Sequence, residues 1–164
     1  MAEPEADLKK VFLVLGVLLL PLSAHAIVID SPSIHITAGE AKTYVHRIVV
    51  RNTGSSPEGV VVYVQDFQYE EPYNGPKKFM PPGTSRLSLA KWCSIAPESF
   101  VIKPGEERIV QLVITPDEPV DMTRCGVVFF ETPISGTGAD TDAVNINSRL
   151  GSLVFLDPAR EDTC

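Results

Sequence analysis

Seven stretches of the chain carry apolar residues in the pattern of β-strands. In one of them Val110, Leu112 and Ile114 fall on one face and more polar residues on the other, which is the period of a half-buried strand. Several others are dense in β-branched residues, which favour strands over helices. After residue 26 no stretch shows a helical period. The expected strands cover residues 27–36, 43–51, 59–67, 99–102, 108–115, 125–131 and 144–157.

Turn signals separate these stretches. Proline presets the backbone for the second position of a turn and glycine tolerates positive φ at the third, so Pro104-Gly105 predicts a corner between two strands. Ser31-Pro32 predicts a break in the first stretch, and Gly151 a bulge or bend in the last. Residues 68–91 predict a long irregular link.

Many short strands within about 130 residues are typical of an all-β fold. The sequence predicts an immunoglobulin-like antiparallel sandwich of two sheets and about seven strands, with a small barrel as the alternative. We assign this domain to residues 27–157 and a polar tail to residues 158–164.

The first 26 residues have the features of a signal peptide. Lys9 and Lys10 precede a 12-residue apolar run at 11–22, and Ser23-Ala24-His25-Ala26 has the small-x-small form of a cleavage site. A helix that spans a membrane needs about 20 apolar residues, so cleavage is favoured over a retained anchor. We therefore expect a periplasmic or extracellular protein that meets the membrane only through its leader.

Charge excludes some partners. The chain has a net charge of −7, and without residues 1–26 it keeps 18 of its 21 acidic and 12 of its 14 basic residues, for a net of −6. Nucleic acids and anionic lipids attract clusters of lysine and arginine, and the sequence has no such cluster. We expect no nucleic-acid partner.

Two cysteines within the domain leave two alternatives open. In an oxidising compartment Cys93 and Cys125 are candidates for a disulfide that closes a loop of about 30 residues and contributes about 3 kcal/mol. The alternative is two separate buried thiols.

Motifs for catalysis or metal binding are not found. His35 and His46 lie on separate expected strands without ligands at metal-binding spacing, and the sequence has neither a nucleophile elbow nor a phosphate-binding loop. We predict no catalytic residue, no metal, no cofactor and no small-molecule substrate.

Residues 95–131 resemble a known family. Pro97, Phe100, Pro104-Gly105-Glu106, the apolar strand 109–114 and the aromatic strand 127–130 follow in the order found in the N-terminal immunoglobulin-like domain of the PapD-like periplasmic pilus-assembly chaperones. Residues 36–54 resemble that domain's first corner and second strand. Related exported bacterial modules share the corner.

The resemblance implies a role in assembly. Pilus chaperones hold a client by β-strand addition, and an edge strand offers unpaired backbone groups for this. We expect the last strand, 144–157, to lie near a sheet edge and to bind a pilin-like or envelope subunit through Ile146, Arg149, Leu150 and Val154. Two alternatives stay open: those apolar residues fill the domain's own core, and the chain is a structural module of a larger surface protein without a client.

Overall fold

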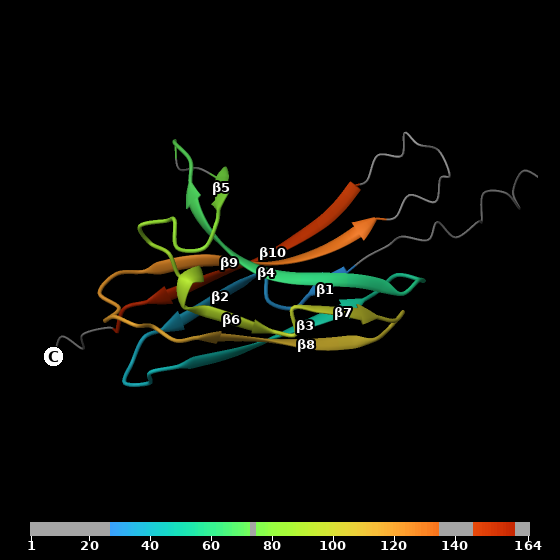
Figure 1. Cartoon of the computed structure of the whole chain (residues 1–164), viewed down its shortest axis with the longest axis horizontal. Coiled ribbons are helices and arrows are strands. Elements are labelled where there is room, and N and C mark those ends of the chain that lie inside the picture. The colour runs from blue at the N-terminus through green and yellow to red at the C-terminus, as the bar shows by residue number, and fades with distance from the viewer. Residues whose placement is uncertain (1–26, 73–74, 135–145, 160–164) are drawn as a thin grey trace, which may run out of the picture.

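The structure is a computed structural model that describes residues 27–72, 75–134 and 146–159, and these residues form two β-sheets packed face to face (Figure 1). One sheet has four strands in the order β1-β3-β8-β6. The other has the order β2-β10-β9-β4-β5, with β7 paired to β4. The elements are β1 (Ile27–Ile29), β2 (Ser33–Thr37), β3 (Tyr44–Asn52), β4 (Glu58–Tyr69), β5 (Lys77–Met80), a 3-10 helix (Ala90–Trp92), β6 (Cys93–Ala96), β7 (Ser99–Ile102), β8 (Glu107–Ile114), β9 (Arg124–Ile134) and β10 (Ile146–Asp157).

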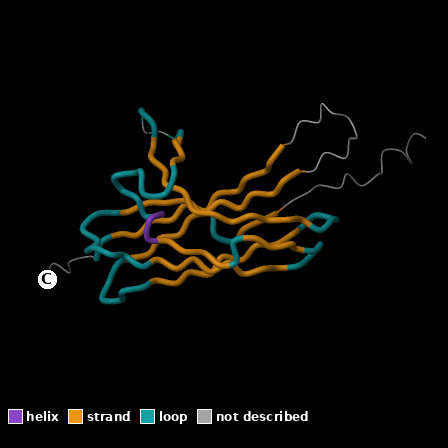
Figure 2. The backbone as a smooth tube through the Cα atoms, viewed as in Figure 1, coloured by secondary structure: helices purple, strands orange, loops and turns teal. Residues whose placement is uncertain are grey.

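The predicted all-β sandwich is therefore confirmed, with three corrections. The pairing of β10 with β2 is parallel, although every other strand pair is antiparallel. Second, the link at 68–91, predicted to be irregular, contains strand β5. Third, strand β6, which lies outside the predicted strands, follows this link. Strands dominate the described chain and its single helix is one short turn (Figure 2), so no described helix is long enough to cross a bilayer.

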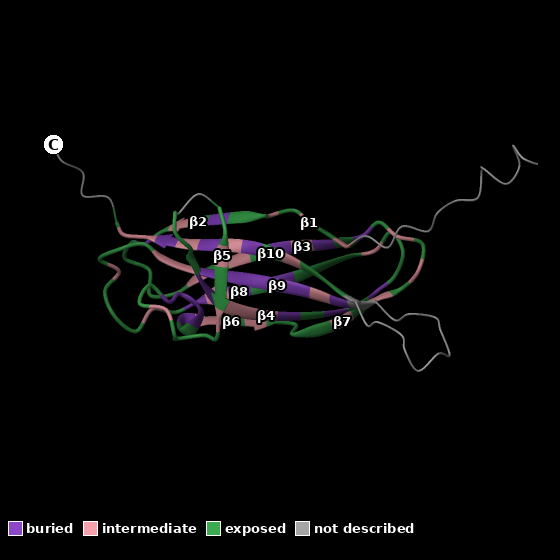
Figure 3. Ribbon diagram, turned by 90° about the horizontal axis from the view of Figure 1, so that it is seen from above, coloured by how far each residue is buried: buried purple, intermediate pink, exposed green. Residues whose placement is uncertain are grey.

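Period-two burial builds the core. Val110, Leu112 and Ile114 of β8 are fully buried between the sheets, whereas Ile109 on the other face of that strand is 43% exposed. Buried positions follow the strands through the middle of the molecule (Figure 3). Because side chains alternate between the faces of a strand, the sequence pattern decides which residues meet in this core.

Strand breaks let the chain change sheets. The predicted break at Ser31-Pro32 separates β1, which pairs with β3 in the smaller sheet, from β2, which pairs with β10 in the larger one. Pro97 occupies the same kind of position between β6 and β7. Proline has no amide hydrogen to continue a ladder. Strands β1 and β2 at one edge of the sandwich, and β6 and β7 at the other, are therefore short strands in different sheets.

The two glycine predictions have different outcomes. Gly105 has a φ of 73° in a turn where the Glu106 amide donates to the Lys103 carbonyl, so the predicted corner is confirmed. Gly151 is not a bulge, because β10 pairs with β9 in unbroken register across it. A Cβ at Gly151 would lie 3.2 Å from the side chains of Val127 and Phe129, so the glycine makes room for them.

A buried carboxylate fixes the long link. Asp66 is fully buried at the point where β4 turns away from β9. Its oxygens accept hydrogen bonds from the backbone amides of Thr84 (2.9 Å) and Ser85 (3.0 Å) and from the Ser88 hydroxyl (2.7 Å). A buried charge needs such partners, and here they hold the end of the link against the sheet.

The alternation on β8 makes a direct stability prediction. Leu112→Ala removes a fully buried side chain and should lower the free energy of unfolding by about 2–5 kcal/mol, measured by urea denaturation. Ile109→Ala, on the other face of the same strand, should cost less than about 1 kcal/mol. Equal losses for the two variants would contradict the described burial.

Candidate functional site: the open half of strand β10

Strand β10 has a neighbour along its whole length on one side only. It pairs with β9 from Ile146 to Leu156, but β2 pairs with it only from Leu153 to Asp157. Among the described residues, none pairs with 146–152 on the β2 side. We call these seven residues the open half of β10. It exists because the chain leaves this sheet at Pro32.

The backbone groups that face outward can be assigned. The Leu153 amide donates to the Pro32 carbonyl (3.0 Å), so it points to the β2 side. Successive residues of a strand point their amides to opposite sides. The amides and carbonyls of Asn147, Arg149 and Gly151 therefore face the unpaired side.

The four predicted partner-binding residues divide between the two halves. Ile146, Arg149 and Leu150 lie in the open half, whereas Val154 is buried in the half that β2 covers. Leu150 is half-buried and packs against the core. The expected edge position is therefore correct for only part of the strand.

A polar network on the outer face, which is the face of the larger sheet turned away from the core, holds the open half to its neighbours. The Tyr63 hydroxyl donates to Glu131 (2.6 Å), and the Asn147 side-chain amide donates to the other carboxylate oxygen (2.7 Å). The Arg149 guanidinium lies 3.6 Å from the same carboxylate and 5.0 Å from the Phe129 ring centroid. Strands β4, β9 and β10 are thus tied together where β2 is absent.

The ionisation states of Glu131 and Tyr63 favour this network at neutral pH. The hydrogen bond from Tyr63 is the main cause that lowers the pKa of Glu131. Burial, followed by the same hydrogen bond, raises the pKa of Tyr63 to about 12. The carboxylate is therefore charged and the phenol protonated, which is the pair of states that the hydrogen bond needs.

Cys93 and Cys125 are free thiols, which is the second of the two sequence alternatives. Cys93 packs against the core between the sheets, and its thiol donates to the Leu89 carbonyl (3.3 Å). Cys125 packs on the outer face and its thiol donates to the Phe67 carbonyl (3.5 Å). Burial is the main cause that raises the pKa of each thiol, to about 12 for Cys93. Neither thiol is activated as a nucleophile.

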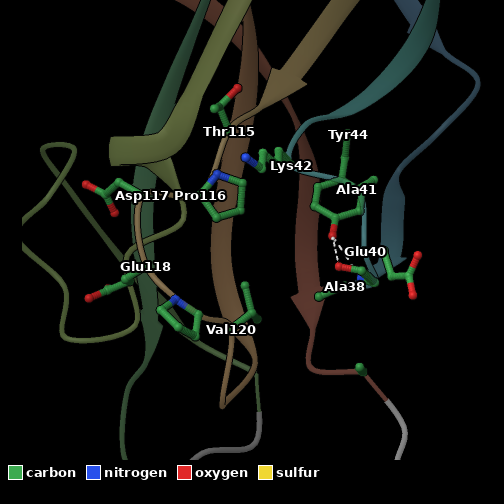
Figure 4. A pocket seen from close by; sticks show the side chains of 13 residues that line it. Ala38, Glu40, Ala41, Lys42, Tyr44, Thr115, Pro116, Asp117, Glu118 and Val120 are labelled. Carbon is green, nitrogen blue, oxygen red and sulfur yellow. Dashed lines mark hydrogen bonds between the residues drawn. The ribbon is translucent and has the colours of Figure 1, made fainter.

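A cavity of about 640 Å³ lies at one end of the sandwich, between the β2–β3 and β8–β9 loops. The Lys42 ammonium points across it, whereas Asp117 and Glu118 point away (Figure 4). Asp117 accepts from the Trp92 indole, and Glu118 pairs with Lys91 and Arg124. Asp117 and Glu118 therefore stabilise the β8–β9 loop. No group of three metal ligands occurs in the described part of the chain.

Comparison with known proteins places the fold. No family model and no curated protein match the sequence. Among solved structures, the CsuC–CsuE chaperone–tip adhesion subunit complex of Acinetobacter baumannii matches with a TM-score of 0.56 and 14% identity, over 82% of this chain and 52% of that one. The Salmonella enterica SafA pilin–SafB chaperone complex matches with 0.55 and 14%, over 82% and 55%.

A single domain also matches. The ASH/PapD-like domain of human CEP192 has a TM-score of 0.51 and 10% identity, over 88% of this chain and 92% of that domain. The chain thus spans about half the length of the bacterial matches and nearly all of the human domain. These likenesses show a PapD-like immunoglobulin-like fold.

Glu131 predicts a pH dependence. A carboxyl group whose folded-state pKa is lowered stabilises the fold above its unfolded pKa of about 4.3, and this contribution is lost as pH falls through the folded value. Glu131→Gln should therefore lower the free energy of unfolding by about 1–2 kcal/mol at pH 7 and by clearly less at pH 3.

Urea denaturation at the two pH values measures the difference. Glu98→Gln, at an exposed carboxyl group outside the network, is the control and should have the same small effect at both. A Glu131→Gln effect that does not shrink at pH 3 would count against the charged network.

Proposed function

We propose that this chain is an exported, non-enzymatic PapD-like protein that takes part in envelope assembly by β-strand addition. An extended segment of a partner protein pairs with the open half of β10. The observation that carries this proposal is that no described residue pairs with 146–152 on the β2 side, whereas β9 pairs with all seven of these residues on the other side.

Unpaired backbone groups supply the affinity. The outward amides and carbonyls of Asn147, Arg149 and Gly151 form the ladder positions that an added strand needs, and the added strand satisfies them without unfolding the domain. The added strand lies beside β10 in the position that β2 occupies from Ser33 onward. The Glu131 network keeps β10 extended before the partner arrives, which lowers the ordering cost of binding.

Side chains supply the specificity. Ile27 and Ile29 of β1 and Leu150 of β10 are only partly buried where they meet the core, and β1 lies near β10. Alternate side chains of an added strand point toward this gap between the sheets. The partner segment is therefore apolar at every second position, and its other side chains face solvent beside Asn147 and Arg149.

The partner is a pilin-like or envelope subunit. The Acinetobacter match is a chaperone with a tip adhesion subunit, and the Salmonella match is a chaperone with a pilin. Arg149 contributes to the proposed site as an organiser of β10, because its guanidinium is engaged by Glu131 and Phe129.

A structural module of a larger surface or envelope protein is the second candidate. Its support is the match to the CEP192 domain, of which this chain covers 92%, against 52% of the Acinetobacter chain. A module without a client has no strand to add at the open half, so the experiment on β10 separates the two.

A cross-linking experiment tests strand addition. A photoreactive benzoylphenylalanine at Ser148, an exposed residue of the open half, should cross-link an apolar-alternating segment of an envelope protein in the source cell. The control is the same group at Val101, which is 61% exposed on β7. A synthetic peptide of the captured segment should then bind the isolated protein.

Two variants at one position separate backbone from side chain. Arg149→Ala removes the guanidinium, and Arg149→Pro also removes the outward amide. The proline variant should bind that peptide about five- to tenfold more weakly than the alanine variant, for the loss of one hydrogen bond of about 1 kcal/mol. Equal affinities, or capture at Val101 as strong as at Ser148, would rule out strand addition on β10.

Export predicts a defined N-terminus. The expected cleavage site follows Ala26, and β1 begins at Ile27. Expression of the full chain in a bacterium and N-terminal sequencing of the periplasmic fraction should give a chain that starts at Ile27. Ala24→Lys and Ala26→Lys together should block processing, because the peptidase accepts small residues there. A cytoplasmic, unprocessed chain would contradict export.

A further inference from the structure

The outer face of the larger sheet carries an apolar layer of its own. Phe67, Val127 and Phe129 are buried there, on the side of the strands opposite the core. A solvated sheet face is normally polar. Strand β5 crosses over this face (Figure 3), and the ring of Phe79 packs edge-on against Phe129 at 4.9 Å. The β4–β5 hairpin thus covers one part of the layer and leaves another part open.

A groove of about 510 Å³ occupies the open part. Phe67 and Cys125 line it from the sheet, Tyr69 from the end of β4, Leu87 from the link that follows β5, and Met122 from the β8–β9 loop. Tyr69, Leu87 and Met122 are each 37–40% exposed, which is unusual for three large apolar side chains that line one hollow. The hydrogen bonds of Asp66 to the Thr84 and Ser85 amides hold the adjoining link, so the groove is preformed.

The charge at the groove is positive in a protein whose net charge is −7. Arg86 lines the groove with an exposed side chain, and within the described chain its guanidinium has no carboxylate partner. Lys77 lies over the Tyr69 ring, 4.9 Å from its centroid. Among the residues that the structure describes, no aspartate or glutamate lines the groove. The end cavity differs, because Glu40 and Lys42 bring both signs to it.

From this combination we propose that the groove binds a second segment of a protein partner, one that presents an apolar or aromatic side chain flanked by carboxylates. The apolar side chain fills the hollow between Leu87 and Met122, where the flexible thioether adapts to its shape. The guanidinium of Arg86 pairs with a flanking carboxylate, for which its planar fork is suited.

The groove is separate from the proposed strand-addition site. It lies at Cys125, which pairs with Phe155 in the covered half of β10, whereas the open half pairs with residues 128–134. Both sites therefore fit one partner or two partners at the same time. Binding of a peptide in the groove therefore does not require that a strand is added to β10.

Methionine NMR tests the groove directly. The chain has three methionines, and of these Met122 lines the groove while Met80 ends β5 outside it. With [methyl-13C]methionine, a hexapeptide that has Leu-Phe at its centre and two acidic residues on each side should shift the Met122 methyl signal saturably. The Met80 signal should move less. The absence of a Met122 shift at millimolar peptide would overturn the proposal.

Charge variants test the specificity. Arg86→Glu should weaken the peptide about five- to tenfold, and Lys103→Glu, the same charge change at the remote Pro104-Gly105 corner, should leave the affinity unchanged. A hexapeptide with lysines in place of the acids should bind more weakly. Equal binding of both peptides, or no effect of Arg86→Glu, would reduce the groove to nonspecific apolar contact. Vesicles of phosphatidylglycerol that shift Met122 as strongly as the peptide would assign it to a lipid surface instead.

Discussion

The structure depends on where one strand stops. Strand β2 cannot extend beyond Ser33 along β10, because Pro32 has no amide hydrogen and the chain crosses there to the opposite sheet. The same crossing places β1 at the edge of the smaller sheet. This one break makes β1 and β2 short, and among the described strands only β9 then pairs with residues 146–152 of β10. The proposed function follows from this local constraint on the backbone.

An edge with one neighbour frays unless side chains hold it. Here the Glu131 carboxylate on β9 accepts hydrogen bonds from Tyr63 of β4 and Asn147 of β10 and lies near Arg149 of β10. These side-chain contacts on the outer face hold the open half in place, as a second neighbouring strand would do through its backbone. The outer face is thus more than a solvated surface. It stabilises the open half through the network around Glu131, and its uncovered part forms the groove beside Leu87 and Met122.

Much of this architecture can be read from period and turn chemistry. The alternation at Val110, Leu112 and Ile114 and the corner at Gly105 are local signals, and the structure has both. The partners of Asp66 and the pairing of strand β5 could not be predicted, because both depend on how the 68–91 link folds back on β4: the partners of Asp66 are 18–22 positions away, and those of β5 are 8–14 positions away. The partial cover of β10 depends on pairing between residues more than 100 positions apart, which no local pattern encodes.

Amide hydrogen exchange of the isolated domain, followed residue by residue by NMR, measures the openness of β10 most directly. Asn147, Arg149 and Gly151 should exchange far faster than Ser148 and Leu150, whose amides face β9, and faster than Leu153, whose amide is bonded to Pro32. Alternating protection that ends at Leu153 would agree with a half-open strand. Uniform protection of residues 147–153 would show that the edge is already filled and would contradict strand addition there.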